Sequence, residues 1–166
     1  MLRLLVLAIL TIILLHIAGP FDTFFTPDFT GLKPNILVSC LAHGIIEEYI
    51  FRHVYWKNLK TSPHKASLIY INVLLFWVAH VLLLYYTREA EHDYLLRVYE
   101  SVSYQLSIVF AGLFLNALYL ESHPFPLAAC ILAHSTLLIM WTLFLGGNNE
   151  QFYTKYSINR KSANRL

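Results

Sequence analysis

Hydrophobic residues are gathered into five long runs along the chain, and short polar segments separate these runs. The runs cover residues 4–19, 34–56, 66–86, 101–120 and 126–145. Each is close to the roughly 20 residues that a helix needs to cross a bilayer. Because lipid offers the backbone no hydrogen-bond partner, spanning segments of this length must be helical. The pattern therefore predicts an all-α, polytopic bundle of about five transmembrane helices.

The composition agrees with a membrane protein. Of the 166 residues, 57% are hydrophobic and only 13% are charged, whereas about a quarter are charged in ordinary soluble domains. Many of the 11 Tyr and 11 Phe stand at the ends of the runs, as in interfacial aromatic belts. The net charge of +2 does not indicate nucleic-acid binding. No internal repeat is visible, so residues 1–166 are interpreted as a single membrane-embedded domain.

The first run and the polar segments leave two points open. Residues 4–19 could form a signal peptide, but no small-x-small cleavage site follows them and four more runs come later. A first transmembrane helix is therefore favoured. Charge does not decide the orientation, because the basic 57–65 loop and the basic tail would lie on opposite faces of a five-span protein. The charged segment 87–100 is a candidate surface helix.

Three charged residues lie well inside an apolar run, all within GIIEEYIFRH, residues 44–53. A charge at mid-bilayer costs about 2.5–3.5 kcal/mol on insertion scales, so such residues are candidates for function. Glu48 and Arg52 are four residues apart and can pair on one helix face. Glu47 lies about 100° around the helix, on a stripe with His43. Having no certain partner there, Glu47 must be held in its protonated form or meet a base from another helix.

Two later runs supply histidines. His80 follows Phe76 by one helical turn in FWVAH, and His134 lies in ILAHSTLL. Measured from the side of the 57–65 loop, Glu47, His80 and His134 lie at depths of about 15, 21 and 12 Å. We therefore predict that these three groups meet at one level. The second and third spans should be antiparallel neighbours, and so should the fourth and fifth.

Each polar residue also has a purely structural interpretation. A lone intramembrane His is more often a hydrogen-bonding link between helices than a catalyst. Gly44, one turn before Glu48, is a place where a neighbouring helix can approach closely. Cys40 and Cys130 are most simply small packing residues, although Cys130 and His134 could form a nucleophilic dyad. The joint occurrence of Glu-Glu-x3-Arg, Phe-x3-His and a third His favours a catalytic site.

These motifs resemble those of the CPBP family of intramembrane glutamic proteases, which includes the type II CAAX prenyl endopeptidases and bacteriocin-processing proteins. The family's EExxxR motif is similar to residues 47–52, and its FxxxH motif to residues 76–80. Its HxxxN or HxxxD motif is similar to residues 134–138. The resemblance covers about residues 34–146, a core of four helices. One position differs, because Leu138 stands where the family has Asn or Asp.

The resemblance implies an endopeptidase that needs neither a serine nor a cysteine nucleophile, and no cofactor. Glu47, assisted by His80, would activate a water molecule that attacks a peptide carbonyl. Glu48 and Arg52 would orient the base or the substrate, and His134 would stabilise the oxyanion. Another polar side chain is expected to stand in for the missing Asn or Asp, and the candidates are Ser135, Thr142, Asn72 and Asn116.

Two other functions stay open. Glu47, His80 and His134, with His43 as a fourth donor, could ligate zinc in a metalloprotease, although the HExxH motif is absent. The missing Asn or Asp at Leu138 would also suit a degenerate protease that acts only as a membrane interaction protein. A proton-coupled transporter is disfavoured, because no repeat of broken helices is visible.

The resemblance also gives the expected partners and location. The partners are the lipid bilayer and a membrane-associated peptide or protein substrate. A CAAX-like C-terminus, a leader peptide and a C-terminal sorting tag all fit as substrates. The expected location is the cell membrane, as a multi-pass protein of the bacterial inner membrane. Neither the substrate nor the oligomeric state follows from the sequence.

Overall fold

The computed structural model describes residues 2–18, 34–57, 63–87 and 100–144, and every structural statement below concerns these residues. They contain helices and no strand. The elements are α1 (Leu2–Ala18), α2 (Pro34–Glu48), the π-helix η3 (Tyr49–Val54), α3 (Tyr55–Lys57), α4 (Lys65–Thr87), α6 (Val102–Glu121) and α7 (Pro126–Phe144). Ser101 caps α6, because its hydroxyl accepts a hydrogen bond from the Tyr104 backbone N–H.

The prediction of an all-helical membrane bundle is confirmed. The five apolar runs correspond to α1, to the continuous helix α2–η3–α3, and to α4, α6 and α7. Three helices are long and apolar enough to cross a membrane, over Ala66–Leu83, Val102–Glu121 and Pro126–Leu143. Helix α1 is also apolar and has 17 residues. The predicted surface helix at 87–100 and the basic tail lie outside the described residues.

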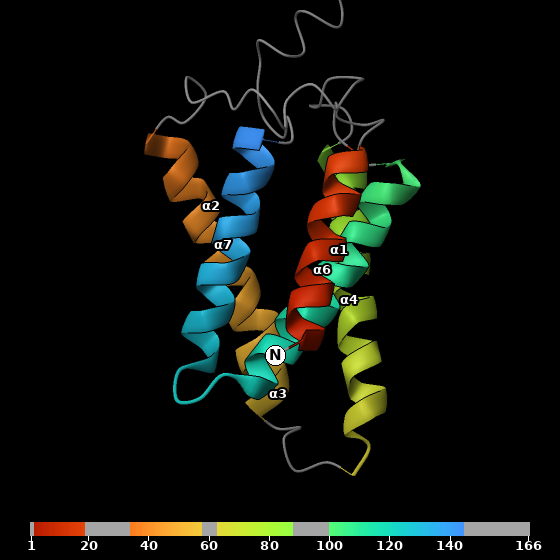
Figure 1. Ribbon diagram of the computed structural model, residues 1–166, viewed down its shortest axis with the longest axis vertical. Helices are drawn as coiled ribbons and strands as arrows, with labels where there is room; N and C mark the ends of the chain where they lie inside the picture. Colours follow the sequence, from red (N-terminus) through yellow and green to blue (C-terminus); the bar gives the residue numbers. More distant parts are fainter. Residues whose placement is uncertain (1, 19–33, 58–62, 88–99, 145–166) are drawn as a thin grey trace, which may run out of the picture.

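The helices form two groups that are joined through α6 and α7. Helix α2 lies beside α7, whereas α1 and α4 both pack on α6 (Figure 1). The predicted contact between the fourth and fifth spans, α6 and α7, is confirmed. The second and third spans are antiparallel neighbours, as predicted, from Glu47 onward, where Glu47 lies near His80 and Phe51 packs on Phe76, although α4 makes its main helix contact with α6. The second span meets α4 through side chains of η3 and α3, as in the bond from Tyr55 to the Leu68 carbonyl.

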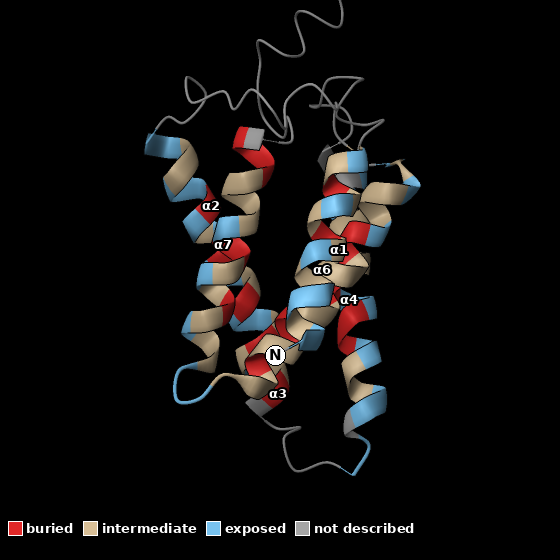
Figure 2. Ribbon diagram, in the orientation of Figure 1, coloured by how far each residue is buried: buried red, intermediate tan, exposed pale blue. Residues whose placement is uncertain are grey.

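The bundle is apolar outside and partly polar inside. Large apolar side chains are exposed on every long helix, among them Ile9, Val38, Tyr70, Leu106 and Leu132. Buried residues lie along the sides on which the helices meet (Figure 2). The buried polar side chains include Glu48, Arg52, Asn72, Asn116 and His134. Exposed apolar groups suit a lipid environment, and the buried polar groups mark the interior as the place of function.

One small residue sets the contact between α2 and α7. A Cβ atom added at Gly44 would collide with Ser135 Oγ and would lie 3.2 Å from the Ile131 carbonyl oxygen. The close helix approach that was predicted at Gly44 is therefore confirmed. It brings the end of α2, with its two carboxylates, against the middle of α7.

Candidate active site

The five predicted site residues come together where α2 passes into η3. Two belong to α2, one to η3, one to α4 and one to α7, and they are Glu47, Glu48, Arg52, His80 and His134. Three of the five share the continuous helix α2–η3, and α4 and α7 each bring one histidine to it. The cluster divides into a buried part and a partly exposed part.

The buried part is centred on Glu48. Its Oε1 atom lies 2.7 Å from Nδ1 of His134 and 3.3 Å from Nη1 of Arg52, and both Glu48 and Arg52 are fully buried. Arg52 also donates to the Gly112 carbonyl at 3.4 Å, and its guanidinium lies 4.5 Å from the centre of the Phe76 ring. The predicted pair of Glu48 and Arg52 is present. The sequence did not show that His134 is its third member.

The partly exposed part is centred on Glu47. Its Oε2 atom lies 3.7 Å from Nε2 of His80 and 3.8 Å from Nε2 of His134. The side chains of Glu47 and His80 are 20% and 21% exposed, whereas that of Glu48 is 0% exposed. Both distances exceed a direct hydrogen bond and suit a bridge through one water molecule. Glu47 and His80 are therefore the more exposed side chains of the cluster, although the Oε2 atom of Glu47 is itself buried without a hydrogen-bond partner.

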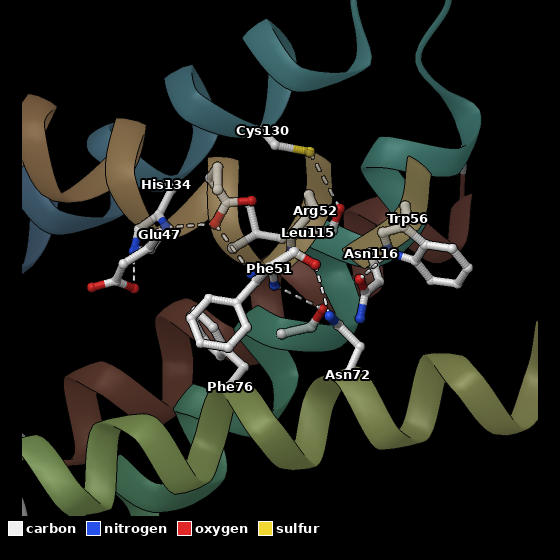
Figure 3. Close-up of polar contacts among 12 residues, drawn as sticks. Glu47, Phe51, Arg52, Trp56, Asn72, Phe76, Leu115, Asn116, Cys130 and His134 are labelled. Atoms are coloured by element: carbon white, nitrogen blue, oxygen red, sulfur yellow. Dashed lines mark hydrogen bonds and ion pairs between the residues drawn. The ribbon is translucent and has the colours of Figure 1, made fainter. Parts of the chain in front are cut away.

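Neighbouring groups orient both histidine rings. Nδ1 of His80 lies 2.8 Å from the Phe76 carbonyl oxygen, and the two rings are 4.5 Å apart. A carbonyl oxygen only accepts, so Nδ1 carries the hydrogen and Nε2 turns its lone pair toward Glu47. The ring of His134 lies beside Glu47 (Figure 3), with Nδ1 directed at Glu48. Each ring thus presents Nε2 to the same carboxylate.

A wider helical turn and a buried amide shape the segment that carries Arg52. Residues Tyr49–Val54 form a π-helix, a rare feature that often occurs at functional sites. Fully buried Asn72 on α4 donates from Nδ2 to the Phe51 carbonyl at 2.7 Å, and Phe51 packs edge-on against Phe76 (Figure 3). The sequence suggested Asn72 only as a candidate substitute for the missing Asn or Asp at position 138, and this anchoring role was missed. The signal in the sequence was the spacing of four residues between Asn72 and Phe76, which places both on one face of the helix.

A second buried amide was also missed. Asn116 on α6 accepts a hydrogen bond from Nε1 of Trp56 at 3.0 Å, and both residues are essentially fully buried. Trp56 belongs to an apolar cluster with Leu115, Tyr119 and Cys130. This contact fixes the end of the second span to α6. No motif spacing marks it, because the partners are 60 residues apart.

Four side chains were candidates to replace the Asn or Asp that is missing at position 138. Their contacts in the structure are with groups other than Glu47. Asn72 donates to Phe51, and Asn116 accepts from Trp56. Thr142 donates to the Leu138 carbonyl, and Ser135 lies at the α2–α7 contact beside Gly44. The half-buried Leu138 makes that position apolar. The expectation that one of these four groups helps to hold an oxyanion thus gains no contact in its support.

The alternative nucleophile and the alternative metal site involve Cys130 and the residues around Glu47. Cys130 is fully buried, and its thiol donates to the Leu115 carbonyl at 3.3 Å rather than to His134. Among the described residues, no group of three or more His, Cys, Asp and Glu side chains is arranged to hold a metal ion. The zinc ligand set Glu47, His80 and His134 stays a prediction, and no step below passes through a metal.

Comparison with known proteins gives one match. Residues 29–140 match the family model described as type II CAAX prenyl endopeptidase Rce1-like. The matched range contains all five residues of the cluster, all of α2, η3, α4 and α6, and most of α7. Neither the curated proteins nor the solved structures give a match.

Proposed function

The chain belongs to the Rce1-like family of type II CAAX prenyl endopeptidases, and from this premise we propose that it is an intramembrane endopeptidase of the glutamic type. Membership makes it a membrane-associated protease with a peptide substrate. The chemistry is our proposal. One observation carries it, namely that Oε2 of Glu47 lies 3.7 and 3.8 Å from Nε2 of His80 and of His134.

The first step is activation of water. A water molecule held between Glu47 and His80 donates one hydrogen to the Glu47 carboxylate and the other to Nε2 of His80. Glu47 takes a proton as the oxygen attacks the carbonyl carbon of the substrate, which forms the new C–O bond. A general base placed in this way typically contributes 10²–10⁴-fold in rate. The partial exposure of both side chains supports this assignment.

The second step is stabilisation of the oxyanion. His134 donates Nδ1–H to Glu48, and a further proton on Nε2 makes its ring a cation that the Glu48 carboxylate balances. Nε2–H is then directed to the side where Glu47 and the substrate carbonyl meet. Collapse of the intermediate breaks the C–N bond, and Glu47 returns its proton to the leaving nitrogen. One oxyanion donor is typically worth 10²–10³ in rate.

Glu48 and Arg52 have a positioning role in this proposal. Both side chains are fully buried, so they do not reach a substrate directly. With Glu47 and Glu48 ionised, and Arg52 and His134 protonated, the formal charges of the four side chains cancel. A cancelled set of charges reduces the large penalty for burying ions inside a bundle. Arg52 thereby balances the Glu48 carboxylate that accepts the hydrogen bond from His134.

We propose a membrane-associated substrate with a CAAX-like C-terminus, a leader peptide or a C-terminal sorting tag. The family favours the first of these. We also propose a multi-pass location in the cell membrane, as in the bacterial inner membrane, with no cofactor. The three helices that are long and apolar enough to span support the multi-pass arrangement.

The test is hydrolysis by purified protein in detergent. A panel of fluorogenic peptides, prenylated and unmodified, is incubated with the wild type, and products are identified by mass. Cleavage should persist after treatment with a strong zinc chelator. Activity that is lost with the chelator and regained with zinc would replace this proposal with the metalloprotease. Inactivity on every peptide, with the protein shown to be folded, would favour a non-enzymatic interaction protein.

A further inference from the structure

The cation of the site, Arg52, has two adjacent carboxylates within reach. Arg52 is fully buried and makes its ion pair with Glu48, at 3.3 Å from Nη1 to Oε1. Glu47 has its ion-pair contacts with His80 and His134 instead. This division of partners matters for the chemistry, because a carboxylate that faces a permanently charged guanidinium is a weaker base.

The backbone of the helix does not by itself assign Arg52 to Glu48. Glu48 precedes Arg52 by four residues and Glu47 precedes it by five. In an α-helix, residues three and four positions apart face each other. Residues Tyr49–Val54 form a π-helix, however, in which hydrogen bonds join residues five apart. Both carboxylates thus lie about one turn before Arg52, and a group outside this helix has to decide which of them it meets.

Phe76 on α4 supplies such a group (Figure 3). The guanidinium carbon of Arg52 lies over its ring, 4.5 Å from the centre, and the Phe76 side chain is only 2% exposed. The face of an aromatic ring carries partial negative charge and attracts a cation within about 6 Å, most strongly where water is excluded. Nη2 of Arg52 also donates to the Gly112 carbonyl at 3.4 Å. The ring and the carbonyl together hold the guanidinium where Nη1 reaches Glu48.

The same ring also touches the histidines. Its centre lies 4.5 Å from that of the His80 ring and 6.0 Å from that of the His134 ring. The backbone carbonyl of Phe76 accepts a hydrogen bond from Nδ1 of His80. Phe76 is therefore in contact both with the cation that balances Glu48 and with a histidine that faces Glu47. It lies at the junction of the buried and the partly exposed parts of the site.

We propose that Phe76 is a positioning residue, whose aromatic face keeps Arg52 on Glu48 and so leaves Glu47 free to act as the base. This inference rests on the proposed function. Without the attraction of the ring, the guanidinium turns toward Glu47, which loses basicity, while Glu48 loses the charge that balances it. Because Phe76 is almost fully buried and acts through Arg52, its effect falls on kcat and not on KM.

The test changes the charge on the face of the ring and nearly keeps its shape. Mono-, di- and trifluorinated phenylalanine are placed at position 76, because each fluorine withdraws negative charge from the face and weakens its attraction for a cation. We expect kcat to fall stepwise, by about 10-fold for the trifluorinated ring, which corresponds to about 1.4 kcal/mol. KM should stay within about twofold. The same residues at Phe125, which is 74% exposed directly before α7, should leave kcat unchanged.

A second measurement shows whether the effect passes through Arg52. The free energy of unfolding, measured in one detergent, should fall along the fluorinated series in the otherwise unchanged protein. It should not fall in the double variant Glu48→Gln/Arg52→Leu, which lacks the cation. Phe76→Leu keeps an apolar side chain without the aromatic face, and it should lose most of its kcat at unchanged KM. The fluorinated proteins supply the comparison if Phe76→Leu does not fold.

The outcomes separate the positioning role from the protease. If wild type is active and kcat is the same throughout the series, Phe76 only fills space, and the inference is overturned while the proposed protease stands. An unfolding free energy that falls equally with and without Arg52 would overturn it as well. If wild type cleaves no peptide, the proposed function fails, and the unfolding series decides whether the ring holds Arg52. A decrease that requires Arg52 would support that contact, whereas equal decreases in both backgrounds would refute it.

Discussion

Replacement of Glu48 by Gln keeps the shape of the side chain and removes the charge on which the buried cluster depends. Glu48 Oε1 is 2.7 Å from His134 Nδ1 and 3.3 Å from Arg52 Nη1. After the change, Arg52 keeps a 3.4 Å contact with the Gly112 carbonyl and the face of Phe76. Removing one partner of a buried ion pair costs about 3–5 kcal/mol. We expect the lower end, about 3 kcal/mol, because the Gln amide still hydrogen-bonds.

The measurement is unfolding of wild type and Glu48→Gln in one detergent, with cleavage rates measured in parallel. Glu121→Gln is the control, because Glu121 pairs with the exposed Arg3 at the bundle end, where an ion pair contributes about 0–1 kcal/mol. Adding Arg52→Leu to Glu48→Gln should restore part of the stability, since no unpaired charge stays buried. It should not restore activity, because His134 still lacks its carboxylate.

Two results would refute this reasoning. The first is a Glu48→Gln protein that unfolds together with the wild type and with Glu121→Gln. The second concerns the double variant Glu48→Gln/Arg52→Leu. Its free energy of unfolding would be lower than that of Glu48→Gln by as much as Arg52→Leu alone costs the wild type. Either result would mean that Glu48 and Arg52 are solvated or otherwise compensated, and that His134 does not depend on them.

Three smaller changes test other parts of the site. Leu138→Asn adds an amide one helical turn after His134, the proposed oxyanion donor, and we expect single-turnover cleavage to rise about 10-fold, or about 1.4 kcal/mol of barrier. An unchanged rate would show that another donor already acts there. Asn72→Leu leaves the Phe51 carbonyl buried without its donor, so the protein should lose about 1–3 kcal/mol of stability and most of its kcat at unchanged KM; wild-type kcat would contradict the anchoring role. Gly44→Ala should lower stability by about 1–3 kcal/mol through overpacking, and Ser135→Ala in the same protein should restore part of it; failure of this rescue would show that the two residues do not meet.

Helix lengths and the first ion pair could be predicted from the sequence, because both follow from local spacing. A spanning helix needs about 20 apolar residues, and the predicted run 101–120 corresponds to α6 at Val102–Glu121. The pair of Glu48 and Arg52 follows from four residues of separation on one helix. The similar level of Glu47 and the two histidines followed from depth, since helical rise converts residue number into height, whereas their lateral approach depends on packing.

What could not be predicted depends on how helices pack. The preference of α4 for α6 over α2 is decided by side chains spread over three helices, and no single spacing records it. The contact between His134 and Glu48 depends on the close approach at Gly44, which lowers α7 onto α2. The π-helix at Tyr49–Val54 adds one residue to a turn, and apolar periodicity does not reveal that within six residues.

The central claim is that Glu47 acts as the base for water, without a metal. The most direct measurement is the single-turnover cleavage rate of Glu47→Gln against wild type, both treated with chelator and matched for folding. Gln keeps the shape of the side chain and cannot take the proton. We predict that wild type keeps its rate after the treatment and that Glu47→Gln is slower by about 10²–10⁴-fold. A Glu47→Gln rate within about fivefold of wild type would contradict the account.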